Sequence, residues 1–270
     1  MTKYRGIQIV NALLIVLFGV SGLYLQMYPS KWYLFTYYTI LSNSLVVLFF
    51  ALHVILLVTK RKGILGSKLY VRAKAAVTTA ILMTFFTFGI LLLPKTDPAE
   101  VMAYDNLAVH FIVPILVGLD WLFFDPRGLY RRIEPLLWTV IPLIYLFYAL
   151  IRGIVFKIPI PESKESPFPY FFLNGYKMGW DTVALYCVVM LILFILLGYV
   201  MYWIKRKKKR GPLGSEFWRA RFLGTLGYER LARCVSNATR FSLVNRSHAV
   251  LAVLGFGRSP AKAPSPAVRI

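Results

Sequence analysis

The chain has 270 residues, of which 58% are hydrophobic and only 16% are charged, and its mean hydropathy is +0.63. A soluble domain of this size cannot bury so large an apolar fraction. The composition therefore excludes a soluble globular protein and indicates a chain that crosses a membrane several times. Two cysteines, Cys187 and Cys234, give neither a disulfide framework nor a zinc-binding pattern.

Apolar runs bounded by charged residues or proline recur six times before residue 205, each about 20 residues long, as a membrane-spanning helix requires. They lack the alternation of a strand, and in lipid a helix satisfies its own backbone hydrogen bonds. We therefore predict an all-α polytopic bundle of six transmembrane helices, over residues 7–27, 34–58, 75–93, 107–124, 136–151 and 182–204.

The formal charge of +21 is distributed unevenly over the loops between these runs. Seventeen lysines and arginines of residues 1–210 fall on one side of the predicted bundle and five on the other. Positively charged loops stay on the cytoplasmic side, so both termini are predicted to be cytoplasmic in a plasma-membrane protein. Because the cations flank the spans, they indicate membrane lipids as partners and no nucleic acid.

The composition changes after the cationic run at residues 205–210. Residues 211–270 hold eight arginines and one lysine, and the segment 211–217 resembles a protease-site and cloning remnant. We expect a six-helix transmembrane domain over residues 1–210, followed by a basic cytoplasmic tail over 211–270 that is a fusion or read-through segment. The alternative is a basic amphipathic segment at the membrane surface.

Ionisable side chains inside a membrane are costly and mark candidate functional sites. Depth along the spans places Thr36 of the second run and His110 of the fourth at one level, near the outer surface. Thr36, Thr39 and Asn43 are spaced to share one helix face. The same predicted layer also receives three further polar side chains, from Gln26, Arg152 and Asp181.

Pro114 follows His110 by four residues and lacks the N–H that would bond to the carbonyl of His110. We predict that the helix is kinked or locally opened beside the histidine, in a polar, partly hydrated cavity. For two other ionisable side chains inside the membrane we predict structural roles. His53 lies near the inner end of the second run, and Asp120 is expected to pair with a cation such as Arg72 or Arg131.

Three segments carry a resemblance to a known family: residues 34–43 (LFTYYTILSN), 105–114 (DNLAVHFIVP) and 119–121 (LDW). They resemble the bacterial Pr-six-Pr integral membrane family, which is distantly similar to the eukaryotic androgen-induced six-helix membrane proteins. Those relatives are threonine hydrolases that cleave fatty acid esters of hydroxy fatty acids. The resemblance, over residues 1–208, implies that Thr36 is the catalytic threonine and His110 the catalytic histidine.

Such a pair implies that His110 removes a proton from Thr36, which attacks an ester carbonyl. Asn43, Thr39 or Arg152 would stabilise the oxyanion, and Asp105 or Asp181 would orient the imidazole. The aromatic and proline-rich loop 157–180 would cover the site as a lid, or else anchor the chain at the interface.

Two other functions remain open from the sequence. The polar layer would also suit a protein that binds or transports a small solute or lipid, and it would suit a non-enzymatic scaffold in which polar pairs fix helix packing. Neither a phosphate-binding glycine loop nor a paired-histidine zinc motif is present, so we expect no cofactor and no metal.

Overall fold

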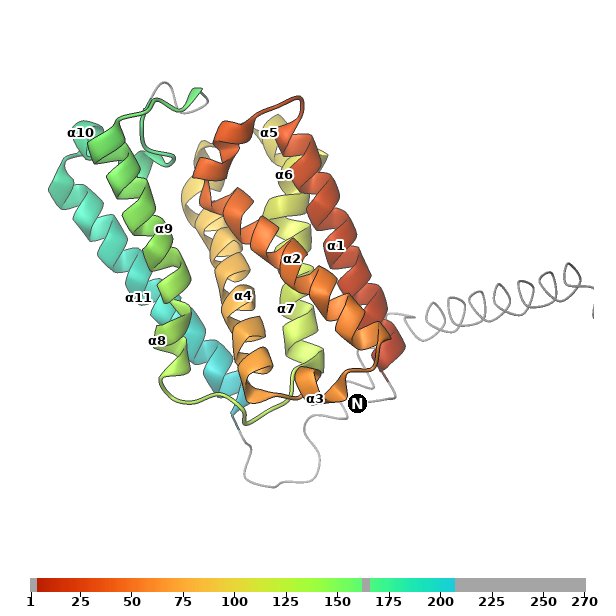
Figure 1. The fold of residues 1–270 in the computed structure, drawn as a ribbon. Coiled ribbons are helices and arrows are strands. Elements are labelled where there is room, and N and C mark those ends of the chain that lie inside the picture. The colour runs from red at the N-terminus through yellow and green to blue at the C-terminus, as the bar shows by residue number, and fades with distance from the viewer. Residues whose placement is uncertain (1–3, 162–165, 207–270) are drawn as a thin grey trace, which may run out of the picture. The chain divides into compact units, whose positions relative to one another are not determined.

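The computed structural model describes residues 4–161 and 166–206, and over these residues it contains helices and no strands (Figure 1). Six helical segments in this part of the chain are long and apolar enough to cross a membrane, which confirms the predicted all-α, six-helix, multi-pass membrane fold. They are Arg5–Met27, Tyr38–Val58, Lys68–Lys95, Tyr104–Phe124, Glu134–Phe156 and Trp180–Lys205. The predicted tail, residues 211–270, lies outside the described residues.

Three of the six spans are interrupted by π-helical turns. The third consists of α4 (Lys68–Thr87), the π turn Phe88–Leu92 and the short 3₁₀ turn Leu93–Lys95. The fourth joins α6 (Tyr104–Leu107) to α7 (Val113–Phe124) through the π turn Ala108–Ile112. The fifth contains α8 (Glu134–Trp138), α9 (Val140–Ile151) and the turn Arg152–Phe156. The uninterrupted spans are α1 (Arg5–Met27), α2 (Tyr38–Val58) and α11 (Trp180–Lys205).

Short elements lie at the two ends of the bundle. The upper end in Figure 1 carries α5 (Pro98–Met102) and α10 (Gly175–Met178), and the lower end carries α3 (Lys62–Leu65). Two short 3₁₀ turns also belong to the connections, η1 (Trp32–Thr36) and η7 (Phe171–Leu173). We use upper end and lower end in this sense below.

Helices α1, α2, α4 and α7 contact one another in a ring and enclose the main apolar core. Helices α8, α9 and α11 form an outer pair of spans that packs against α4 (Figure 1). Many large apolar side chains on this outer pair are half exposed or more, as is typical of helices that face lipid. Those of α9 and α11 include Ile144, Phe147, Leu185 and Val188.

A buried charge cluster joins α4 to α7 near the lower end. The ammonium group of Lys74 forms ion pairs with Asp120 and, at 2.5 Å, with Asp125, and all three side chains are at most 4% exposed. The predicted partner of Asp120 was therefore wrong, because the cation is Lys74, whereas Arg72 pairs with Glu134 at 3.0 Å. The sequence prediction began the third span at Ala75, but the helix begins at Lys68 and turns Lys74 inward.

His53 has a structural role beside this cluster. Gln8 Nε2 lies 3.2 Å from His53 Nε2, and His53 Nδ1 lies 2.5 Å from the hydroxyl of Tyr70. The amide therefore donates to one ring nitrogen, and the other ring nitrogen donates to the phenol. These bonds tie α1, α2 and α4 together at the lower end.

Candidate functional site

The imidazole of His110 projects from the π-helical turn Ala108–Ile112, and such turns are often found at functional sites. In this turn the N–H of Val113 bonds to the carbonyl of Ala108, five residues back. In that register the missing N–H of Pro114 leaves the carbonyl of Val109 without a donor. The helix is thus locally opened as predicted, but the affected carbonyl belongs to Val109 and not to His110.

Asn43 compensates for the missing backbone donor. Its Nδ2 atom donates to the carbonyl of Val109 at 3.1 Å and to the carbonyl of Thr39 at 2.8 Å, and the side chain is fully buried. One amide therefore joins the start of α2 to the π turn. This holds the helix face of Thr39 against that of His110.

Hydrogen bonds fix the orientation of the His110 ring. Nδ1 lies 3.2 Å from the carbonyl oxygen of Asn106, and Nε2 lies 3.2 Å from Thr39 Oγ1. A carbonyl only accepts, so Nδ1 carries the proton, and Nε2 is then the acceptor for the hydroxyl of Thr39. Phe88 stacks on the ring at a centroid separation of 3.9 Å. The pair has the donor and acceptor order that a hydroxyl nucleophile and its general base require.

Tyr170, on the loop that follows α9, reaches the same point. Burial raises the pKa of its phenol above the ordinary value of 10.0, while hydrogen bonds with the side chain of Thr39 and with the backbone of Tyr38 and Thr39 oppose that rise. Tyr170 thus lies against Tyr38 and Thr39. They belong to the first turn of α2, where N–H groups lack partners within the helix.

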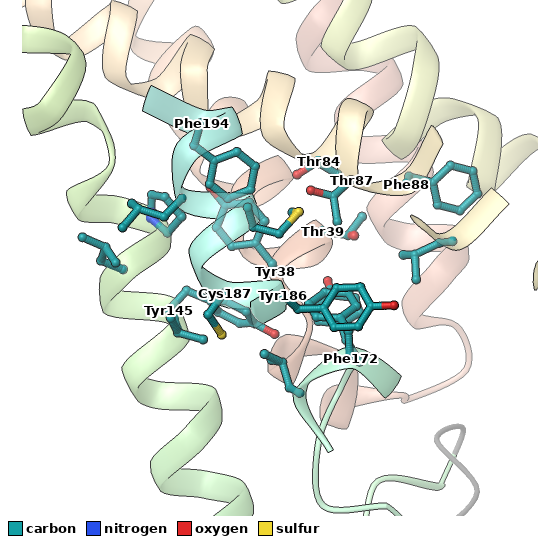
Figure 2. A pocket seen from close by; sticks show the side chains of 18 residues that line it. Tyr38, Thr39, Thr84, Thr87, Phe88, Tyr145, Phe172, Tyr186, Cys187 and Phe194 are labelled. Carbon is teal, nitrogen blue, oxygen red and sulfur yellow. The ribbon is translucent and has the colours of Figure 1, made fainter. Parts of the chain in front are cut away.

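Two cavities meet at Thr39. A polar vestibule of about 740 Å³ opens at the upper end and is lined by His110, Asp105, Asn106 and Gln26, among others. A narrow apolar pocket of about 90 Å³ lies between α4, α9 and α11, and its wall includes Tyr145, Tyr186 and Cys187. Figure 2 shows the side chains of this pocket, with Thr39, Thr84 and Thr87 near one another. Thr39, Phe88, Leu92 and Tyr170 line both cavities.

The structure places Thr36 differently from the sequence prediction. Thr36 ends the 3₁₀ turn η1 and precedes α2, so it does not continue the helix face of Thr39 and Asn43. Its carbonyl accepts a hydrogen bond from Tyr145 at 3.0 Å. Among the described residues, its buried hydroxyl has no hydrogen-bond partner. The hydroxyl that meets His110 is therefore that of Thr39.

Of the other predicted members of the polar layer, Gln26 lines the vestibule with His110, whereas Arg152 and Asp181 do not. Arg152 donates to the carbonyls of Ile158 and Pro167, each at 2.8 Å, and so holds the loop against the end of the fifth span. Asp181 is exposed at the start of α11. Asp105 lies in the vestibule wall, but the group that orients the imidazole is the carbonyl of Asn106.

Sequence reasoning missed Tyr170 and Phe88 as site residues. The aromatic loop 157–180 was predicted either to cover the site or to anchor the chain at the interface, and its residues Pro169, Tyr170 and Phe171 line the vestibule. Nothing in the local sequence of this loop indicates which of its aromatic rings reaches Thr39. For Phe88, the proline at position 94 was a usable signal, because it follows the π turn Phe88–Leu92 as Pro114 follows the turn that holds His110.

Within residues 4–161 and 166–206, no group of three or more histidine, cysteine, aspartate or glutamate side chains is arranged to hold a metal ion. Comparison of the chain with protein-family models, with curated proteins and with solved structures gave no match.

Proposed function

We propose that this protein is an intramembrane hydrolase of lipid-like esters, with Thr39 as nucleophile and His110 as general base. The supporting observation is the contact of 3.2 Å between Thr39 Oγ1 and His110 Nε2, two side chains each 8% exposed, where a polar and an apolar cavity meet. The three segments that resemble the Pr-six-Pr family favour the same reaction class, because that family is distantly similar to threonine hydrolases. The proposal moves the nucleophile from Thr36 to Thr39.

The reaction follows from the hydrogen-bond order. His110 Nε2 takes the hydroxyl proton as Thr39 Oγ1 bonds to the ester carbonyl carbon, which gives a tetrahedral oxyanion. His110 then returns that proton to the departing alcohol oxygen, and the acyl group stays on Thr39. A water deprotonated by His110 attacks the acyl carbon, and the carboxylic acid leaves as Thr39 regains a proton. The carbonyl of Asn106 stabilises the imidazolium that forms twice in this cycle.

The oxyanion would lie at the start of α2. N–H groups in the first turn of a helix lack partners within the helix and stabilise negative charge, and Thr39 is itself in that turn. Tyr170 stays protonated near neutral pH because burial raises its pKa, so its hydroxyl is a further donor at this position.

The two cavities suggest how an ester would bind. The apolar pocket would take an acyl chain, since its wall is made of aromatic and aliphatic side chains from α4, α9 and α11. The vestibule would take the more polar alcohol portion and supply water. The ester carbonyl would then lie at Thr39, which both cavities share.

The direct test is hydrolysis of p-nitrophenyl esters of graded chain length by the purified protein in nanodiscs. We expect turnover that improves when the acetyl ester is replaced by a medium-chain ester, and a loss of ~100-fold or more in His110→Gln. Saturable thermal stabilisation by the ester without any turnover would instead indicate a binding or transport protein.

We also propose that both termini face the cytoplasm and that the upper end, with the site, faces outward. The lower end carries the start of α1, the segment 60–68, the segment 127–132 and the end of α11 (Figure 1). These parts of the chain are rich in lysine and arginine, as is typical of a cytoplasmic surface. In a variant without Cys187 and Cys234, an impermeant maleimide should label Lys31→Cys in intact cells and leave Lys62→Cys unlabelled until the cells are opened.

A further inference from the structure

We propose a second binding site, at the lower end of the bundle, for a phosphate-class anion, either free phosphate or the phosphate of a lipid headgroup. It occupies a cavity of about 60 Å³ between the ends of α1, α2 and α4. This inference does not depend on the proposed hydrolysis, because the cavity shares no lining residue with either upper cavity.

The charge of the wall favours an anion. Arg5, Lys60, Lys62 and Lys74 line the cavity together with one carboxylate, that of Asp125, and Lys74 is already paired with Asp120 and Asp125. Asp125 is already held, since its Oδ1 pairs with Lys74 and its Oδ2 accepts from the hydroxyl of Tyr130 at 3.3 Å. Among the described residues, Lys60 and Lys62 form no ion pair, so their ammonium groups are available to a ligand.

Arg5 neutralises the carbonyl end of α2, whose partial negative charge would otherwise repel an anion in this cavity. The last carbonyls of a helix carry partial negative charge, and α2 ends at this cavity. The guanidinium of Arg5 donates to the carbonyls of Leu57 and, at 3.1 Å, of Val58. The end of α2 is therefore neutralised, and the cavity keeps its positive character.

Neutral hydrogen-bonding groups complete the wall. The hydroxyl of Tyr70 accepts from His53 Nδ1, so its own hydrogen can be donated to a ligand oxygen, and Gln8 adds an amide. A cavity needs about 10–15 Å³ for each water-sized group, so 60 Å³ accommodates the five heavy atoms of a phosphate group. Lysine ammonium groups bind phosphate as point charges, so Lys60 and Lys62 suit such an anion.

Binding is tested by the melting temperature of the full chain, purified in a non-ionic detergent. It is titrated with inorganic phosphate, with sodium chloride at matched ionic strength, and with short-chain phosphatidylglycerol or phosphatidylcholine. We expect a saturable rise with phosphate or phosphatidylglycerol and not with chloride. A response to inorganic phosphate identifies a free-anion site, and a response to phosphatidylglycerol alone identifies a headgroup site.

The variants separate a site from general surface charge. Lys60 and Lys62 are exposed, so the double variant Lys60→Gln/Lys62→Gln should fold, and its apparent affinity should fall by ~10-fold or more. The matched control Arg61→Gln/Lys68→Gln removes two exposed cations from the same end that do not line the cavity, and should keep the wild-type affinity. The proposal is overturned if no saturable rise occurs, or if both double variants lose affinity equally.

Discussion

Thr39 Oγ1 lies 3.2 Å from His110 Nε2, although the two residues are 71 positions apart and belong to different spans. The contact depends on the π turn that projects His110 and on Asn43, which joins that turn to the first turn of α2. A hydroxyl is thus directed at an imidazole whose other nitrogen is fixed by a backbone carbonyl. The following predictions test this arrangement and the fold around it.

Thr39→Val should abolish ester hydrolysis, with a loss of ~100-fold or more, because valine keeps the shape and removes the nucleophile. Thr39→Ser should retain measurable turnover. Thr36→Val is the matched control and should leave kcat nearly unchanged, since among the described residues the hydroxyl of Thr36 has no partner. A large loss in Thr36→Val together with normal turnover in Thr39→Val would return the nucleophile to Thr36.

Asn43→Leu should lower both stability and activity. It leaves the buried carbonyl of Val109 without a donor, which costs about 1–3 kcal/mol of folding free energy. It also removes the bond that holds the π turn against α2, so kcat per folded molecule should fall as well. The measurements are chemical denaturation and kcat per folded molecule, and an unchanged kcat would show that Asn43 supports packing alone.

Tyr170→Phe should reduce kcat by ~10-fold or more, because it removes one donor from the proposed oxyanion position. Burial raises the pKa of Tyr170 above 10.0, so the protonated donor form persists up to that pH and is lost only above it. Between pH 8 and about 10, the rate of the wild-type protein should therefore not fall through ionisation of Tyr170, and the pH–rate profiles of wild type and Tyr170→Phe should have the same shape over this range. Such a fall would contradict the proposed role.

Lys74→Met should destabilise the fold by about 3–5 kcal/mol, because it leaves two buried carboxylates without their cation. Adding Asp120→Asn and Asp125→Asn should recover part of that loss. Lys68→Met, an exposed position on the same helix, should change the free energy of unfolding by only about 0.5 kcal/mol or less. Equal effects at positions 68 and 74 would argue against the buried cluster.

Gly153→Ala tests the packing of the loop over the site. A Cβ atom at Gly153 would overlap the ring of Phe168, which is fully buried, so the loop must shift and carry Tyr170 with it. Turnover should fall in this variant. Gly89→Ala is the control, because it also lies in a π turn and its added methyl group meets no described atom within 4 Å.

The sequence was sufficient to predict the six spans, because each is a long apolar run and the spacing of apolar residues carries that information directly. The opening of the helix near His110 also followed from one residue, Pro114. The predicted positions of the helix ends were less accurate. The second span was predicted to begin at residue 34, but α2 begins at Tyr38, and this difference removes Thr36 from the face that meets His110.

Contacts between distant segments could not be read from spacing. Lys74 was assigned to a loop because the third span was predicted to begin at Ala75, and only the packing of α4 against α7 directs it to Asp120. Tyr170 belongs to a loop with many aromatic residues, and the one that reaches Thr39 is selected by how Arg152 and Phe168 fold that loop. Both cases depend on tertiary structure.

The central claim is that Thr39 is the nucleophile, and covalent labelling tests it most directly. The purified protein is treated with a fluorophosphonate that bears an alkyl chain, digested, and sequenced by mass spectrometry. The account predicts a phosphonyl adduct on Thr39 that is absent in His110→Gln and in Thr39→Val but present in Thr36→Val. An adduct on Thr36, or equal labelling of wild type and His110→Gln, would contradict it.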